Sequence, residues 1–436
     1  MGDCAAVTVL SGFSHDGGDL HMHTSLDGQQ HGGALTGIRV LELGRLVAAP
    51  TCGQILGDLG ADVVKVERAG KGDEYRSYGP HFLADPAGGP SMESSAWISA
   101  NRNKRGIALN FADPADLEVL RQLAARCDVF IENFKAGGLR RFGLDYASVA
   151  AVNPDVIYLS VTGFGQDGPY AQRPGTDGVC QALSGLQNVT GEPDRPSQKV
   201  GVTVVDLVSG LNAAISVLAA LRAREVRGKG GQQIDAALMD SALWLVAHKA
   251  IDFRISGQVP YRTGNAVAGA APSFTYVAAD GEIFIQAAWD DHFQRFCQAI
   301  DRPDLAADPR FSAWRDRDEN QKELNALLQE EIGRYNIADL VARLEAAQIL
   351  HAPVQTVAQA LDDPHVRFRA NEVRQSHPWG EVTTIASPHR LSRTPPTYRR
   401  APPLLGQDNA EVLADWLGPL NPQGVVTEKL ANGGGR

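Results

Sequence analysis

The carboxylate of Asp194 is the group in this sequence that most directly suggests covalent chemistry. Asp194 lies in the segment Thr-Gly-Glu-Pro-Asp-Arg-Pro, residues 190–196. Proline fixes its own φ and biases the preceding residue toward extended backbone, so Pro193 and Pro196 stiffen the chain around Asp194. A carboxylate held in a defined direction can act as a nucleophile toward an acyl group. The alternative interpretation is a surface turn, because aspartate beside proline and glycine is common in turns.

A second carboxylate, Asp177, competes for the same role. It stands in Pro-Gly-Thr-Asp-Gly, residues 174–178, upstream of a long apolar helix predicted at residues 207–224. Aspartate is also a preferred residue at the start of a helix, where its side chain accepts backbone N–H groups. We interpret Asp177 as a structural cap for a helix that begins near Val179.

The segments that must position these carboxylates alternate between strand and helix. Short apolar runs predict strands at residues 38–43, 62–67, 107–110, 128–132 and 156–161. A helix opened by Pro50 and closed by Gly60 joins the first two runs, and this βαβ unit predicts a parallel sheet with a right-handed crossover. We therefore expect an α/β fold with a mostly parallel sheet. The first strand-to-helix turn lacks GxGxxG, so it carries no dinucleotide fingerprint.

Length and changes in composition predict two domains. At roughly 150 residues per domain, a chain of this length forms two or three lobes. We expect a large domain at residues 35–230, a linker helix at 231–254 and a smaller α+β domain at 255–365. Within the linker, residues 234–250 predict a short strand followed by the helix. Residues 371–418 are Pro-rich and are expected to be irregular up to a final helix near 409–416. We expect this last segment to return to the large domain.

Composition excludes several function classes. A net charge of −10 leaves no basic field for nucleic acid, and no apolar run approaches the roughly 20 residues of a membrane span. The five cysteines are odd in number and include no CxxC pair, so neither a disulfide framework nor a metal site is indicated. We expect a cytoplasmic protein. Residues 1–34 are Gly- and His-rich without a signal-peptide pattern, and we expect disordered extensions there and at 419–436.

Five motifs, in order along the chain, resemble those of the family III CoA-transferases of the CaiB/BaiF type. They are GIRVLELGRLVAAPTCGQILGDLGADVVKVER from residue 37, NRNKRGIALN from 101, IENFKAGGLRRFG from 131, SVTGFGQDGP from 160, and TGEPDRP from 190 followed by DLVSG. The resemblance covers about residues 35–417. It implies a Rossmann-like large domain, a small domain and an obligate homodimer of two chains interlocked like links.

The resemblance also implies roles for single residues. The family's nucleophilic aspartate falls on Asp194. Its contacts to the CoA moiety fall on Val47, Ala48, Arg68, Leu109, Asn133, Phe134 and Arg141. The sequence departs from the family pattern at Thr162 and Ala112, where relatives have lysine. The residues that bind the CoA phosphates are therefore expected to differ here.

The acyl end of the implied site differs from that of the oxalate enzymes. Arg45 stands where those enzymes have histidine, and Val47 stands where they have glutamine. A guanidinium suits a second carboxylate, so we expect a dicarboxylate such as succinate rather than oxalate. Tyr78 can line the acyl pocket, and backbone amides from Gly264 to Gly269 can stabilise an oxyanion.

The implied reaction moves CoA from an acyl-CoA to a free carboxylic acid through an aspartyl anhydride and an aspartyl-CoA thioester. It needs no metal and no permanently bound cofactor; CoA and acyl-CoA are substrates. A racemase on the same fold is the alternative. Racemisation needs an acid–base pair, and the acidic member of that pair would correspond to Asp206. Racemases carry His where Thr176 stands, and threonine cannot serve as the base near neutral pH. A non-catalytic CoA-binding scaffold is the third interpretation.

Overall fold

The computed structural model describes residues 33–267 and 269–418 of the chain. Of the predicted extensions, residues 33 and 34 are described, whereas residues 1–32 and 419–436 lie outside the described residues. So do the four N-terminal histidines and Cys4.

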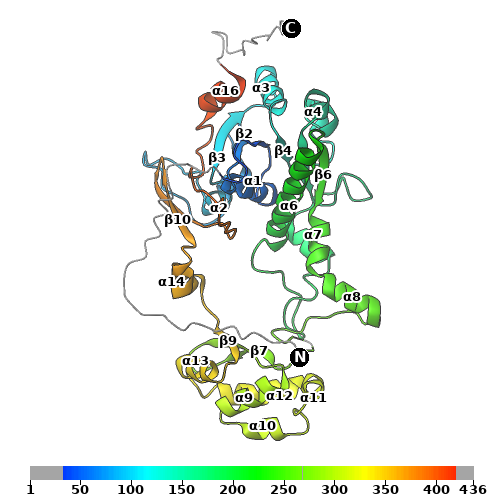
Figure 1. Cartoon of the computed structure of the whole chain (residues 1–436), viewed down its shortest axis with the longest axis vertical. Coiled ribbons are helices and arrows are strands. Elements are labelled where there is room, and N and C mark those ends of the chain that lie inside the picture. Colours follow the sequence, from blue (N-terminus) through cyan, green and yellow to red (C-terminus); the bar gives the residue numbers. More distant parts are fainter. Residues whose placement is uncertain (1–32, 268, 419–436) are drawn as a thin grey trace, which may run out of the picture.

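A six-stranded parallel sheet forms the centre of the large domain (Figure 1). Its strands are β1 (Arg39–Glu42), β2 (Asp62–Arg68), β3 (Lys104–Leu109), β4 (Val129–Glu132), β5 (Ile157–Thr162) and β6 (Gln232–Ala237). They lie in the order β3-β2-β1-β4-β5-β6, and every neighbouring pair is parallel. This is the strand order of Rossmann folds, in which ligands bind where the order reverses, here between β1 and β4. The α/β prediction is confirmed.

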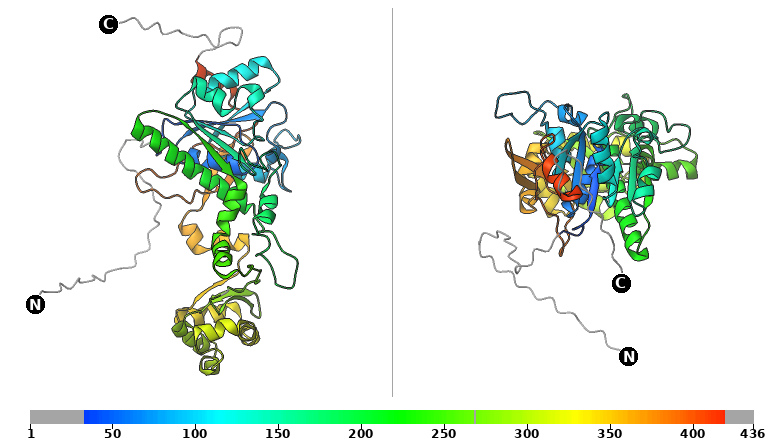
Figure 2. Two further views of the ribbon diagram at one scale, coloured as in Figure 1. Left: turned by 90° about the vertical axis from the view of Figure 1, so that its right-hand side faces the viewer. Right: turned by 90° about the horizontal axis from the view of Figure 1, so that it is seen from above.

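Helices cover both faces of this sheet (Figure 2). One face packs against α1 (Ala48–Asp58), α5 (Asp177–Leu183), α6 (Val204–Arg227) and α7 (Leu238–Leu245). The other packs against α3 (Pro114–Ala124), α4 (Tyr146–Val152) and α16 (Asn409–Leu417). Strands buried on both faces have apolar runs without alternation, which explains why the sequence predicted β1 to β5.

The longest of these helices, α6, is the one described helix that is long and apolar enough to cross a membrane. The expectation that no apolar segment approaches that length is therefore corrected. Val205, Ala213 and Val217 on α6 are fully buried, and the helix packs against α1, β5 and β6. Gly228 then ends the helix in the left-handed conformation, with φ 75°. This helix is thus a core helix of the large domain.

A separate hydrophobic core defines the small lobe. Its three-stranded antiparallel sheet consists of β7 (Ser273–Val277), β8 (Glu282–Gln286) and β9 (Leu350–Pro353). Five helices cover this sheet: α9 (Asp290–Ala299), α10 (Pro303–Ala307), α11 (Trp314–Glu319), α12 (Gln321–Ile332) and α13 (Ile337–Ala346). Tyr276, Phe293, Phe296 and Leu328 are buried between the sheet and the helices. Figure 1 shows this lobe at the opposite end of the molecule from α3 and α16.

Two predicted segments differ from the structure. Residues 231–254 are not simply a linker helix: they hold β6, the sheet's edge strand, followed by α7 and the start of α8 (Ala247–Ser256). The segment after residue 371 is not irregular throughout, because β10 (Glu372–His377) and β11 (Gly380–Ile385) form a hairpin. It follows α14 (Val357–Asp362) and α15 (Pro364–Phe368). Strands β6, β10 and β11 alternate in polarity or are strongly polar, so they lack the continuous apolar runs that predict β1 to β5.

The C-terminal segment lies against the large domain. Trp416 on α16 donates its indole N–H to Asp62 at 2.8 Å, and the Asp408 carboxylate accepts the Gly106 N–H at 2.7 Å. Val412 and Trp416 are buried in the same core cluster as β3 and α3. The outer face of this part of the sheet is therefore completed by the last residues of the described chain.

Candidate active site

Two cavities open at the carboxyl ends of the central strands. The first, of about 340 Å³, lies at the ends of β1, β2 and β3, and we call it the arginine cavity. Its lining includes Arg45, Lys65, Arg68, Phe111, Phe134, Arg141 and Phe142. Phe111 stacks on Phe134 with ring centroids 6.3 Å apart. Cationic and aromatic side chains of this kind suit a phosphorylated nucleotide with a flat base.

The second cavity, of about 600 Å³, lies at the switch between β1 and β4 and extends to β5 and α6. We call it the aspartate cavity. Its lining includes Val47, Ala48, Tyr78, Asn133, Phe134, Thr176 and Asp206. Asn133 holds the loop after β1, because its amide accepts the Arg45 N–H at 2.9 Å and donates to the Arg45 carbonyl at 2.7 Å. This reciprocal pair joins the ends of β1 and β4.

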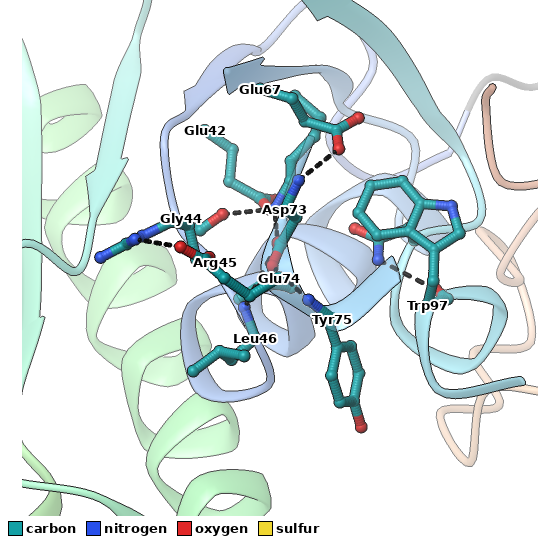
Figure 3. A network of polar contacts seen from close by, with 12 residues as sticks. Glu42, Gly44, Arg45, Leu46, Glu67, Asp73, Glu74, Tyr75 and Trp97 are labelled. Carbon is teal, nitrogen blue, oxygen red and sulfur yellow. Dashed lines mark hydrogen bonds and ion pairs between the residues drawn. The ribbon is translucent and has the colours of Figure 1, made fainter. Parts of the chain in front are cut away.

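A buried ionic network lies against the arginine cavity, which Lys65 and Asp73 line (Figure 3). Lys65 on β2 donates to Glu42 at 3.1 Å, to Asp73 at 3.0 Å and to the Gly44 carbonyl. Lys104 on β3 pairs with the same Glu42 at 2.9 Å. Burial and the neighbouring Lys65 lower the pKa of Lys104 to about 8, against the pull of Glu42. Two carboxylates balance two ammonium groups, all in the protein interior.

Asp73 connects this network to the cavity walls. Its carboxylate accepts the N–H of Leu46, whose φ of 64° lies in the left-handed region, and the N–H of Tyr75. Asp73 is also the N-cap of the 3-10 helix η1 (Glu74–Ser77). One buried carboxylate therefore sets both the loop that carries Arg45 and the helix that carries Glu74.

Asp177 is buried directly behind the surface of the aspartate cavity and does not itself line it. Gly175 and Thr176 precede it at the cavity surface. Its Oδ2 accepts the Val205 N–H at 2.8 Å and the Asp206 N–H at 3.3 Å, while Oδ1 accepts from the Gln181 amide at 2.6 Å. The predicted capping role is corrected in one respect, because Asp177 caps the first turn of α6 rather than the helix near Val179. The positive end of α6 favours negative charge at this position.

Asp206, also in the first turn of α6, lines the same cavity. Burial, and then the charge of Asp177, raise its pKa to about 7. An unfolded chain would lose this proton near pH 4. The folded chain therefore binds more protons than the unfolded chain between about pH 4 and pH 7, and its stability falls as the pH rises through this window.

This proton gives a prediction for Asp206→Asn. In the unchanged protein, the free energy of unfolding measured with urea should fall between pH 5 and pH 8. In Asp206→Asn the fall should be smaller. It should not vanish, because burial also raises the pKa of Glu132 to about 7. Equal slopes in the two proteins would show that Asp206 is ionised throughout this range.

A close contact between two glycines places the loop before Asp177. A Cβ added to Gly175 would lie 2.5 Å from the Gly163 Cα, just after β5. Gly175→Ala should therefore lower stability by about 1–3 kcal/mol and reduce activity by displacing Thr176 and Asp177. Thermal unfolding and turnover assays would measure both effects. Gly178→Ala is the matched control, since nothing lies within 4 Å of its added Cβ; an equal loss there would refute the packing argument.

The structure does not bring Asp194 to either cavity. Asp194 is exposed on a loop that is held by the chain leading to the small lobe. Arg262 donates to the Glu192 carbonyl at 2.9 Å, and the Gly264 N–H donates to the Gly191 carbonyl at 2.9 Å. The two prolines give a stiff loop, but a stiff loop elsewhere on the surface does not position a nucleophile.

The other predicted residues divide into two groups. Those that line one or both cavities are Val47, Ala48, Arg68, Asn133, Phe134, Arg141, Arg45 and Tyr78. Leu109 is buried at the end of β3, and the residues that follow it line the arginine cavity instead. Gly264 and Gly269 line neither cavity. The Gly269 N–H already donates to Asp318 at 2.6 Å, so the predicted oxyanion role is not supported in this arrangement.

Sequence reasoning missed Lys65, Asp73 and Glu74. The available signal was a lysine inside the apolar run of β2, since a lysine in a strand buried on both faces needs a partner. The partners could not be read from the sequence, because Glu42 and Asp73 come from separate segments.

Comparison with known proteins agrees with this geometry. Residues 35–409 match CoA-transferase family III. The chain is 37% identical to a succinate–glutarate CoA-transferase of Agrobacterium fabrum, over 87% of this chain and 95% of that protein. It is 33% identical to the human succinyl-CoA:glutarate CoA-transferase, over 90% of each. The chain therefore belongs to CoA-transferase family III, and the family prediction is confirmed.

Solved structures give the same result for the fold. A CaiB/BaiF family protein from Brucella suis superposes with a TM-score of 0.81 at 38% identity, over 88% of this chain and all of that chain. An aspartate-to-alanine variant of Rv3272 from Mycobacterium tuberculosis superposes with a TM-score of 0.76 at 30% identity, over 87% and 98%.

Proposed function

We propose that this protein transfers CoA from an acyl-CoA to a dicarboxylic acid, with Asp177 as the nucleophile. The observation that carries the proposal is the position of Asp177 beside the aspartate cavity, which adjoins a cavity lined by arginines and aromatic rings. This replaces Asp194, which the sequence had favoured, by the aspartate that it had treated as structural. That an aspartate-to-alanine variant of a relative has been studied fits an important aspartate in this fold.

In this proposal the arginine cavity binds the nucleotide half of CoA. Arg68 and Arg141 stand at its rim to pair with phosphates, and Phe111 and Phe134 offer rings to the adenine base. The thioester then reaches the aspartate cavity. Positions 162 and 112 hold threonine and alanine, so the arginines supply the positive charge that faces the arginine cavity, while the charge of Lys65 is balanced by Glu42 and Asp73.

The proposed covalent steps balance without an added reactant. An Asp177 oxygen attacks the thioester carbonyl, giving an acyl-aspartyl anhydride and CoA thiolate. The thiolate attacks the aspartyl carbonyl, which releases the donor acid and leaves an aspartyl-CoA thioester. The acceptor carboxylate attacks this thioester and expels the thiolate, and the thiolate then attacks the acceptor carbonyl of the new anhydride. New acyl-CoA leaves, and the Asp177 carboxylate is restored.

Arg45 supports a dicarboxylate as the acid. Its guanidinium lines the aspartate cavity and can pair with a second carboxylate. The relatives are named for succinyl-CoA together with glutarate, mesaconate or L-malate, each of which has two carboxylates.

We further infer that the active protein is a homodimer. Large apolar side chains stand exposed on α6, α7 and α8, among them Ile215, Trp244, Ile251 and Ile255, the last 83% exposed. Several large exposed apolar side chains on consecutive helices are unusual on a monomer and suit an interface with a second copy.

A panel of acids tests the function. Succinyl-CoA would be mixed with glutarate or with valerate, which has the same chain length and one carboxylate, and the acyl-CoA products would be weighed by mass spectrometry. We expect glutaryl-CoA in large excess over valeryl-CoA.

Arg45→Ala should reduce the preference for glutarate over valerate by raising the KM for glutarate by about tenfold or more, since charged hydrogen bonds contribute about 1.5–3 kcal/mol. Equal loss with both acids would refute the role of Arg45, and no transfer to any acid would refute the function.

A further inference from the structure

Three side chains form the wall between the two cavities. Arg45, Glu74 and Phe134 are the residues that line both the arginine cavity and the aspartate cavity. The Arg45 Nη1 donates to Glu74 Oε1 at 2.8 Å, and the guanidinium lies 5.2 Å from the centre of the Phe134 ring. Figure 3 shows Arg45 and Glu74 meeting from the loop after β1 and from η1.

The Arg45–Glu74 pair is weakly held, although the backbones that carry it are rigid. The Arg45 side chain is 43% exposed and the Glu74 side chain 57%, and exposed ion pairs contribute little because water competes for both charges. The backbones, in contrast, are fixed by the buried Asp73 carboxylate. The pair can therefore open by side-chain rotation alone.

Arg45 also has an unused donor. Its Nε is buried and has no hydrogen-bond partner among the described residues. A guanidinium can offer two parallel N–H groups to a carboxylate or phosphate, and the single bond to Glu74 uses one N–H. An incoming anion that takes Nε together with an Nη would compete successfully for this side chain.

We propose that the Arg45–Glu74 ion pair is a divider that CoA displaces when it occupies both cavities. This inference rests on the proposed function and adds to it that Glu74 governs passage between the two cavities. Opening of the pair frees the Arg45 guanidinium at the edge of the aspartate cavity, where the acyl group and the second acid bind. Glu74 keeps Arg45 engaged while the cavities are empty.

Equilibrium binding of two ligands tests the divider. CoA spans both cavities, whereas 3′-phospho-ADP, its nucleotide half, fills the arginine cavity alone. Calorimetry would compare the unchanged protein, Glu74→Gln and Glu118→Gln. Glu118 is a matched control, since its pair with Arg121 on α3 has side-chain exposures of 57% and 44% and lines neither cavity. Glu74→Gln should lower the Kd for CoA by about twofold to fivefold, the range of an exposed ion pair. The Kd for 3′-phospho-ADP should not change.

The alternative outcomes have different meanings. Equal tightening of both ligands in Glu74→Gln would show that Glu74 only repels phosphate charge, and this would overturn the divider. No change for either ligand, or the same change in Glu118→Gln, would also overturn it while leaving CoA binding intact. If the unchanged protein bound neither ligand, the proposed function itself would fail, and the divider with it.

Discussion

Asp177→Ala lowers the rate of CoA transfer by roughly a thousandfold or more, because the variant lacks the carboxylate that forms the covalent intermediates. Asp177→Asn should lose as much at first and recover only through slow deamidation, which mass spectrometry can detect. The Asn variant also keeps an oxygen that can accept the Val205 N–H. A loss of rate in this variant without a loss of stability would therefore separate chemistry from helix capping.

Asp194→Asn is the matched control for this experiment. Asp194 is exposed and, unlike Asp177, has no residue lining either cavity among its neighbours in sequence, so we expect unchanged turnover. Trapping gives a direct answer: hydroxylamine added after acyl-CoA should convert the activated aspartate to a hydroxamate. Trypsin leaves both candidates on one peptide, because no lysine or arginine lies between Asp177 and Asp194. Cleavage at Leu183 or Leu186 is needed to separate them. A label on Asp194, or full activity in Asp177→Ala, would overturn the assignment.

Lys65→Met lowers the free energy of unfolding by about 3–5 kcal/mol, the usual cost of removing one partner from a buried ionic group. Lys65 is fully buried, and its removal leaves the Asp73 carboxylate without its ammonium partner and leaves Glu42 with Lys104 alone. Burial by itself would lower the pKa of Lys65, but Asp73 and Glu42 outweigh it and raise that pKa. The ammonium is therefore charged at neutral pH, and its loss unbalances the network. Urea denaturation would measure the change.

Lys71→Met provides the comparison, since Lys71 is exposed on the neighbouring turn and surface substitutions usually change stability by less than about 0.5 kcal/mol. A double substitution, Lys65→Met with Asp73→Asn, should recover part of the loss because it removes the unpaired charge. A small effect of Lys65→Met alone, similar to that of Lys71→Met, would show that water reaches the network.

Much of the fold could be predicted because it depends on local pattern. Strands β1 to β5 are apolar runs bounded by turn residues, and the helices between them have helical spacing. A short strand from Ile234 was predicted within the linker, but the polar sequence of β6, Gln-Gln-Ile-Asp-Ala-Ala, did not indicate that it joins the sheet. It lies at the edge, where one side of a strand pairs with no neighbour and polar residues are tolerated.

The lining of the two cavities could be predicted in outline, whereas the aspartate that we propose as nucleophile could not. Val47, Arg68 and Asn133, which the family resemblance implied, follow or end strands, and they line the cavities because parallel strands place their carboxyl ends together. The choice between Asp177 and Asp194 depended on a long-range contact instead. Asp177 accepts a hydrogen bond from Val205, 28 residues away, and no local pattern reveals which aspartate lies beside the cavity. The two prolines beside Asp194 predict a stiff loop, but they do not predict where in the fold this loop lies.

The packing of α16 against β3 and α3 has a consequence for how the chain is made. Trp416 and Val412 cover an apolar surface formed by residues that are synthesised about three hundred positions earlier. While the ribosome is still translating the small lobe, that surface has no cover. The nascent large domain therefore keeps this apolar surface exposed, and accessible to chaperones, until α16 has left the ribosomal exit tunnel.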